Sequence, residues 1–453
     1  MVKELINRTG RSIRKKFDAE SKTLIKNSSW VFIANFIGAG FAFLRSIVVA
    51  RGLGVDILGY YTIAIAFVTT IQELLKLNVA TGLIKFGAQY LTEKRTDKLV
   101  ALLKTCVAMS MGSALLSVLI IVGIVTAGYD NFIEKPGLEV FIIFYALVSG
   151  LSFMDNIGKG VLKLYYRFRT NSIITIVMDT IEFSIIASVI YFYPARLDYF
   201  FAAVISSRLI NTVVCNLSVL HELKNELLPF MSSKMSLIRN ELRSVTQFTI
   251  GHSFSNTLKT FMNQGDVLLL NTFCGATQVG YYAVAKKLAY AVLTITDPLV
   301  TSIFPQLSVL IARRKYEETK KMLRRITMVT AIPLSFVLFF AFVFRDSIMV
   351  TLYGKEFIPA AAPFFIHLVG AVQGSLFFWV LPLIQSIGMT GLRFRIYIAA
   401  IIAGAGVAYL FIPSLQSSGV ALGLLTSNLI ITATFLFFAF RKINGEQKQG
   451  EPV

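Results

Sequence analysis

Apolar residues occur along the chain in runs of about 20, the length that an α-helix needs to cross the roughly 30 Å hydrocarbon layer of a bilayer. Short polar and basic segments separate these runs. A soluble core of this size cannot hide so many continuous apolar stretches, so the pattern predicts an all-α integral membrane protein with twelve transmembrane helices. The predicted spans are residues 28–50, 57–76, 99–127, 138–158, 171–193, 198–220, 246–273, 280–300, 324–344, 359–385, 394–412 and 417–440.

Lysine and arginine gather in alternate connecting segments. With these spans in place, one side of the membrane holds 32 basic residues and the other side holds 5. Basic loops remain in the cytoplasm, so we expect a multi-pass protein of the cell (cytoplasmic) membrane with both termini inside. The predicted parts are a cytoplasmic tail (1–27), a six-helix bundle (28–220), a cytoplasmic linker (221–245), a second six-helix bundle (246–440) and a C-terminal cytoplasmic tail (441–453).

Composition and charge agree with this class. Of the 453 residues, 55% are hydrophobic. The formal net charge of +19 follows from the basic loops, which attract anionic headgroups of membrane lipids, and gives no reason to expect a nucleic-acid partner. Cys106, Cys215 and Cys274 have no paired spacing. Neither a disulfide nor a metal site is therefore expected, and nothing calls for a cofactor.

The two halves of the sequence repeat each other. A shift of 221 residues aligns them without a gap, and the basic loop after the second span falls on the basic loop after the eighth. A period that covers six helices predicts two homologous bundles rather than a solenoid. The aligned pairs are Gly54 with Gly275, Gly59 with Gly280, Tyr60 with Tyr281, Tyr61 with Tyr282, and Ala64 with Ala285.

The repeat also predicts how the bundles are related. Because six is even, both halves enter the membrane from the same side, and the pseudo-two-fold axis runs along the membrane normal. We expect the glycines of each Gly-x4-Gly corner to supply positive φ and close approach between helices. We expect the paired tyrosines to anchor the corners at the membrane interface.

The two corner segments also resemble those of a known family. VVARGLGVDILGYYTIAIAF and QGDVLLLNTFCGATQVGYYAVAKKL look like the paired signatures of the Wzx-type oligosaccharide flippases in the multidrug/oligosaccharidyl-lipid/polysaccharide (MOP) exporter superfamily. The resemblance covers residues 24 to 440 and implies a V-shaped, MATE-like transporter of two six-helix bundles. It also implies a polyprenyl-pyrophosphate-linked oligosaccharide as substrate, with a polysaccharide polymerase and glycosyltransferases as partners.

Polar residues inside the spans indicate a wet cavity, because ionisable groups in hydrocarbon are costly unless they face water or a partner. Span 246–273 carries His252, Asn256, Lys259, Asn263 and Asp266 on one face. Such a face can line a cationic cavity that binds pyrophosphate and sugar hydroxyls, or it can hold helices together. The candidate substrate-binding residues are Asn35, Arg208, Asn256, Lys259, Asn263, Lys286 and Lys287.

The repeat register places opposite charges at equivalent positions: Arg45 corresponds to Asp266, and Lys76 corresponds to Asp297. One hypothesis is that the first pair closes the outer side and the second closes the inner side during alternating access. The alternative is that all four charges lie unpaired at the interface.

Two further carboxylates, Asp179 and Glu182, lie inside span 171–193. They are candidates for ion coupling, or they form an ion pair within the first bundle, where Arg208 is the nearest predicted cation.

Three classes of function compete. A flippase for an anionic lipid-linked saccharide predicts cationic and amide groups in the cavity, whereas a multidrug exporter of the same superfamily predicts acidic or aromatic ones. A membrane transferase or ligase needs an acid–base or nucleophile cluster, and the three histidines, His221, His252 and His367, lie far apart in the sequence. The sequence therefore favours a non-enzymatic flippase, with the drug exporter as the alternative.

Overall fold

The computed structural model describes the backbone of residues 2–128, 135, 137–222, 234–389 and 392–450. It describes the side chains over the same ranges except 2–28, 222, 252, 254–263, 295, 297–298, 301, 392 and 448–450. These ranges contain no strand and are almost entirely helical.

The helices follow one another as successive apolar segments. Their bounds are α1 (Val2–Leu75), α2 (Val79–Thr92), α3 (Thr96–Gly128), α4 (Leu138–Leu151), α5 (Phe153–Leu164), α6 (Phe168–Phe192), α7 (Leu197–Glu222), η3 (Met235–Ile238), α8 (Leu242–Tyr290), α9 (Leu293–Ala312), α10 (Tyr316–Leu352), η4 (Lys355–Ala360), α11 (Ala361–Leu376), α12 (Val380–Ser386), α13 (Leu392–Leu415) and α14 (Ser417–Gly450).

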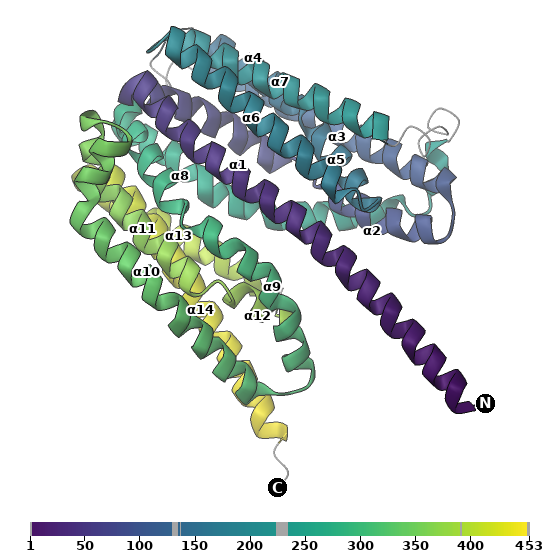
Figure 1. Ribbon diagram of the computed structural model, residues 1–453. Coiled ribbons are helices and arrows are strands. Elements are labelled where there is room, and N and C mark those ends of the chain that lie inside the picture. Colours follow the sequence, from purple (N-terminus) through teal and green to yellow (C-terminus); the bar gives the residue numbers. More distant parts are fainter. Residues whose placement is uncertain (1, 129–134, 136, 223–233, 390–391, 451–453) are drawn as a thin grey trace.

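The helices form two lobes, as Figure 1 shows. We call α1 to α7 the first lobe and α9 to α14 the second lobe. Helix α8 lies between them and packs mainly on α1, and also on α2, α11, α13 and α14. The lobes meet at one end and separate toward the end where α1 begins and α14 ends (Figure 1). We call these the closed end and the open end. The predicted all-α, two-bundle fold is confirmed, while the residue limits of the bundles stay a prediction.

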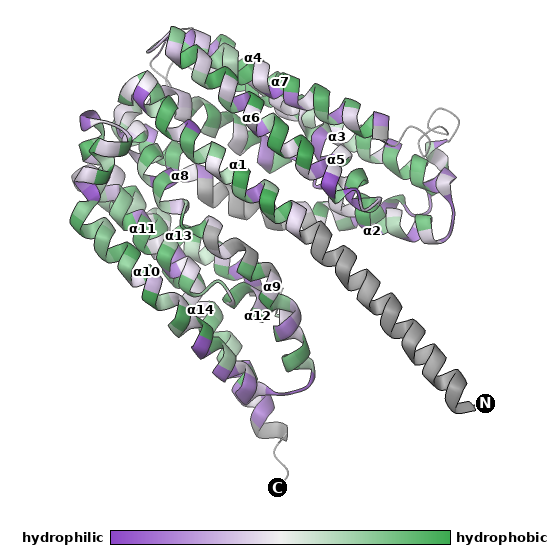
Figure 2. Ribbon diagram, in the orientation of Figure 1, coloured by the Kyte–Doolittle hydropathy of each residue, from purple (hydrophilic) through white to green (hydrophobic). Residues whose placement is uncertain are grey.

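The distribution of apolar and hydrophilic residues agrees with helices that cross a membrane. Apolar residues cover most of the helices, and hydrophilic residues are frequent at helix ends and connections (Figure 2). Within the described ranges, nine helical stretches are long and apolar enough to cross a membrane. One of these stretches, residues 29–92, covers the second predicted span and all but the first residue of the first one. The protein is therefore a multi-pass integral membrane protein.

Each glycine corner joins two helical segments, which share the label α1 or α8, across a non-helical residue. Gly54 has φ 75° inside α1, and Gly275 has φ 72° inside α8. This left-handed backbone favours glycine and turns the chain between predicted spans. The prediction that these glycines provide positive φ is confirmed in both halves.

The structure corrects the prediction that both tyrosines of each pair anchor the corner at the membrane interface. Tyr282 of α8 is fully buried, and its ring lies against His367 of α11. Tyr61 packs edge-on against Phe200 and Phe201 of α7, with ring centroids 4.8 and 5.6 Å away. The helix passes directly from the corner into its lobe, so the second tyrosine of each pair already faces the protein interior.

Three predicted spans are broken within the membrane region. The span 138–158 divides at Ser152 into α4 and α5, 280–300 divides between α8 and α9, and 359–385 divides between α11 and α12. Irregular backbone is tolerated at this depth where neighbouring groups satisfy its polar atoms. The Ser152 hydroxyl, for example, donates to the Ser149 carbonyl at 2.6 Å.

Candidate functional site

A cavity of about 720 Å³ lies between the lobes. Helices α1, α6 and α7 line it on one side, and α8 and the start of α9 line it on the other. Most of its wall is apolar. The polar part consists of Arg45, Ser46, Tyr61, Thr62, Gln264, Lys286, Lys287, Tyr290 and Thr294. The cavity therefore combines apolar surface with cations that come from both halves of the chain.

Arg45 is the cation of the first lobe. Its guanidinium forms an ion pair with Glu182 of α6, and both side chains are about one quarter exposed. The Asp179 carboxylate lies one turn earlier on α6, close to Gly38, where an added Cβ atom would lie 2.6 Å from its Oδ2 atom. An ion pair within the first lobe thus exists, but its cation is Arg45 rather than Arg208, which lies exposed on α7.

Asp266 of α8 forms the centre of a polar cluster where α8 packs against α11 of the second lobe. Its Oδ2 atom accepts hydrogen bonds from the Tyr282 hydroxyl and the Lys286 ammonium, each at 2.5 Å. The Asp266 side chain is 8% exposed and the Lys286 side chain 14%. The His367 ring lies edge-on to Tyr282, with centroids 4.8 Å apart. Lys286 therefore reaches the cavity from a fixed position, held by a nearly buried carboxylate.

Lys287 differs from the other two cations. It is exposed to the cavity, and it forms no ion pair with any side chain that the structure describes. Arg45 and Lys286 each form an ion pair with a carboxylate, so their charges are partly neutralised. Among the cations of the described lining, Lys287 is therefore the one whose charge is least neutralised. Within that lining there are three cations and no carboxylate.

The partners of Arg45 and Asp266 differ from those in the outer-gate hypothesis. In this conformation Arg45 contacts Glu182, and Asp266 contacts Lys286. The hypothesis relied on equivalent positions in the repeat, but each charge finds a partner within its own half, where neighbouring helices are already packed. An exchange of partners in another conformation stays a prediction.

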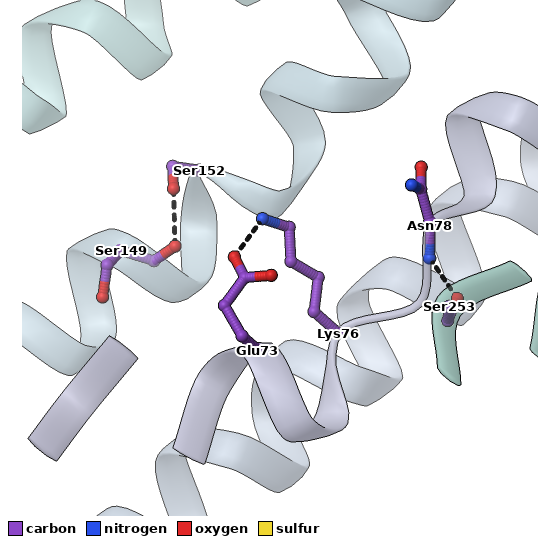
Figure 3. A network of polar contacts seen from close by, with 6 residues as sticks. All are labelled: Glu73, Lys76, Asn78, Ser149, Ser152 and Ser253. Atoms are coloured by element: carbon purple, nitrogen blue, oxygen red, sulfur yellow. Dashed lines mark hydrogen bonds and ion pairs between the residues drawn. The ribbon is translucent and has the colours of Figure 1, made fainter. Parts of the chain in front are cut away.

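Lys76 lies near the junction of α1 and α2, as Figure 3 shows. Its ammonium contacts Glu73 at 2.6 Å and lies 5.5 Å from the centre of the Phe153 ring. Nearby, the Asn78 backbone N–H donates to the Ser253 hydroxyl of α8 at 2.7 Å (Figure 3). The predicted partner of Lys76, Asp297, lies outside the described side chains.

Several predicted binding residues do not take part in the described lining. The side chains of Asn256, Lys259 and Asn263 lie outside the described residues, although their backbone belongs to α8. Asn35 is exposed on α1 and is not part of the lining. Conversely, Thr62 belongs to the wall although the sequence pattern did not predict it. Tyr290 and Thr294 also belong to the wall, as expected from the 4-residue spacing that places them on one helix face with Lys286.

Comparisons with solved structures show the class of fold. The inward-facing conformation of a multidrug resistance MATE family transporter of the MOP superfamily has a TM-score of 0.70 and 13% identity, over 91% of this chain and 96% of that chain. The lipid II flippase MurJ in an inward closed conformation has a TM-score of 0.69 and 11% identity, over 92% and 90%. The chain is thus a multi-pass membrane protein with the fold of the MOP superfamily.

The family follows from the sequence comparison. Residues 64–362 match the family described as polysaccharide biosynthesis protein, and the chain belongs to this family. No curated protein matches this sequence. The match confirms the resemblance to proteins of polysaccharide biosynthesis that the paired glycine corners indicated.

Proposed function

We propose that this protein is a flippase that moves a polyprenyl-pyrophosphate-linked oligosaccharide from the cytoplasmic to the outer leaflet by alternating access. The family, the fold and the cavity support the proposal. In this scheme glycosyltransferases complete the lipid-linked saccharide on the inner face, and a polysaccharide polymerase consumes it on the outer face. Both termini are cytoplasmic, as the asymmetry of basic residues indicates.

The composition of the cavity is the observation that carries the proposal. Its apolar wall suits a lipid chain, and its cations suit a pyrophosphate, which a lysine binds as a point charge. A volume of about 720 Å³ falls within the range of about 300–1,000 Å³ that is common for ligand sites.

The cations lie on both walls of the cavity, and this placement suggests how substrate binding could drive the conformational change. Arg45 comes from the first lobe, while Lys286 and Lys287 come from the second half of α8. A dianionic group between them would attract both sides of the cavity at once. Substrate would then stabilise the arrangement in which the two walls are closest, and so favour passage between inward-facing and outward-facing states.

The same lining argues against the drug-exporter alternative. A cationic drug would need exposed carboxylates or a largely aromatic cage. Here Glu182 and Asp266 already pair with Arg45 and Lys286, and neither belongs to the cavity lining.

The proposal can be tested with purified protein in liposomes that contain undecaprenyl pyrophosphate carrying an NBD-labelled disaccharide. Dithionite bleaches only the outer leaflet, so the rate of complete bleaching reports movement between leaflets. We expect Lys287→Ala to slow movement about tenfold or more, because a charge-assisted contact to the phosphate is lost. Lys287→Arg should stay near the wild-type rate.

The matched control is Lys355→Ala, which removes an exposed lysine of η4 outside the cavity and should leave the rate unchanged. Transport of ethidium, with no movement of the labelled lipid, would support the drug exporter and reject the flippase. Equal rates for Lys287→Ala and Lys355→Ala would reject the role of the cavity.

A further inference from the structure

The two glycine corners touch each other at the closed end through their backbones. A Cβ atom added to Gly59 would lie 1.9 Å from the carbonyl oxygen of Ala276, and one added to Gly280 would lie 2.3 Å from that of Val55. Real Cβ atoms do not approach backbone so closely. Only glycine at both positions permits this contact between α1 and α8.

This contact has the symmetry of the repeat. The 221-residue shift turns Gly59 into Gly280 and Val55 into Ala276, so each half presents the same glycine to the same backbone position of the other. Between these contacts, the Thr277 hydroxyl donates to the Asp56 carboxylate at 2.6 Å, and these two residues are themselves separated by 221 positions. Equivalent residues can meet in this way only next to the pseudo-two-fold axis.

Arg51 extends the contact to a third helix. Its guanidinium donates to the Leu352 carbonyl at 2.8 Å and also to the Thr351 carbonyl, both in the last turn of α10. These carbonyls have no partner within their own helix and lie at its negative end, where a cation is stabilising. Close by, the hydroxyls of Ser46 and Tyr353 lie 3.4 Å apart.

We propose that the paired corners form the gate at the closed end, and that the lobes separate there when the transport cavity opens to that side. The contact residues are Asp56, Gly59, Thr277 and Gly280. Arg51 adds hydrogen bonds from the first corner to the end of α10. This proposal concerns the conformational change alone and rests on no assumption about the substrate.

The geometry suits a contact that must open and close. The atoms nearest to Gly59 all belong to the Ala276 backbone, and those nearest to Gly280 are the Val55 backbone and one Cγ atom of Val55, so few side chains must move when the corners separate. Asp56 and Thr277 are exposed, so water can replace their hydrogen bond at small cost. The carbonyls that Arg51 releases also lie at a helix end, where solvent can reach them.

The test uses a disulfide as reporter. In a variant without Cys106, Cys215 and Cys274, we replace Asp56→Cys and Thr277→Cys and insert a protease site between α7 and η3. An oxidised gate holds the two fragments together on a non-reducing gel. We expect rapid cross-linking, and Gly59→Ala should lower its rate by on the order of tenfold, because the added methyl group forces the backbones apart.

Two variants make the test specific. Gly280→Ala should reproduce Gly59→Ala, since the contact is symmetric. Gly123→Ala is the matched control, because a Cβ atom at Gly123 in α3 would meet nothing within 4 Å, and it should leave the cross-linking rate unchanged. Each variant is first checked for a single peak in size-exclusion chromatography.

Thr277→Val in a second series removes the hydrogen bond without adding bulk, in case the alanine variants do not fold. For this variant, spin labels are attached at positions 196 of the first lobe and 355 of the second, after Arg196→Cys and Lys355→Cys. The distance between the two labels should be long in a larger fraction of molecules than without Thr277→Val. Similar cross-linking rates for Gly59→Ala and Gly123→Ala, or unchanged distances for Thr277→Val, would overturn the gate. If the wild-type protein shows the expected cross-linking and distance changes but moves no labelled lipid in liposomes, the gate stands and the proposed substrate is wrong.

Discussion

Each cavity cation has a different local environment, and this decides what its removal should do. Lys286 neutralises Asp266, which is 8% exposed and also accepts from Tyr282. Lys287 has no such partner among the described side chains. Two adjacent lysines on one helix therefore serve different purposes: one is required for the stability of the lobe, and the other is available to a ligand.

Lys286→Met should destabilise the protein by about 3–5 kcal/mol, because it leaves a nearly buried carboxylate without its cation. Adding Asp266→Asn should restore most of the stability, since the pair is then removed together, while lipid movement stays slow. Thermal unfolding in detergent measures the first effect and the liposome assay the second. Lys287→Met is the control and should leave the melting temperature near that of the wild type. Equal melting temperatures for the two lysine variants would contradict this account.

Small residues hold the last two helices of the second lobe together. A Cβ atom on Gly404 of α13 would lie 2.5 Å from the carbonyl oxygen of Gly423 in α14, and one on Gly423 would lie 2.4 Å from that of Gly404. The Ser427 hydroxyl donates across the same interface to the Ala400 carbonyl at 2.9 Å. Such close packing is how membrane helices associate without a hydrophobic driving force between them.

Gly423→Leu should therefore cost about 1–3 kcal/mol, because it forces α13 and α14 apart. Gly406→Leu provides the comparison, since a Cβ atom at Gly406, also in α13, would meet nothing within 4 Å. Melting temperatures in the same detergent should fall for the first variant and remain unchanged for the second. A fall of the same size in both would show that this interface is not closely packed.

At the scale of the molecule, α8 connects the lobes. Its first half packs against the first lobe, where Phe248 contacts Phe86 and the Lys85 ammonium, and its second half carries the Asp266 cluster. The start of the helix is also fixed by Glu241, which accepts from Lys98 at 2.5 Å and from Tyr90. A movement of the lobes must therefore bend α8 or break one of these attachments.

The attachment at Glu241 should depend on pH. Hydrogen bonds from Lys98 and then Tyr90 hold the pKa of this carboxyl below its ordinary value of 4.5. A lowered pKa adds stability above pH 4.5, and this stability is lost as the pH falls through the lowered value. Lys98→Met should thus reduce the melting temperature at pH 7, and the difference from the wild type should shrink toward pH 3. Lys94→Met, on an exposed neighbour, should show no such trend.

Much of this architecture follows from the sequence, because span length, loop charge and a gap-free repeat are local or periodic properties. The positive φ of Gly54 and Gly275 was predictable for the same reason. Charge partners were not. Arg45 meets Glu182 instead of Asp266 because the choice among carboxylates at similar depth depends on how each helix is rotated and packed. The breaks at Ser152 and after Tyr290 were not predicted either, because local hydrogen bonds, such as those from the Asp155 N–H to the Ser152 carbonyl and from the Thr294 N–H to the Ala291 carbonyl, carry the chain through them within apolar sequence.

The meeting of Asp56 with Thr277 bears on how the chain arose. An ancestral six-helix chain that assembled as a homodimer would have placed the same residue against its own copy at this point. Two aspartates there would repel each other, and two threonines would form a weaker, neutral pair. Fusion of duplicated genes removes that restriction, because each copy of the position can then mutate alone. A hydroxyl that donates to a carboxylate at this position requires the two copies to differ, as they do here.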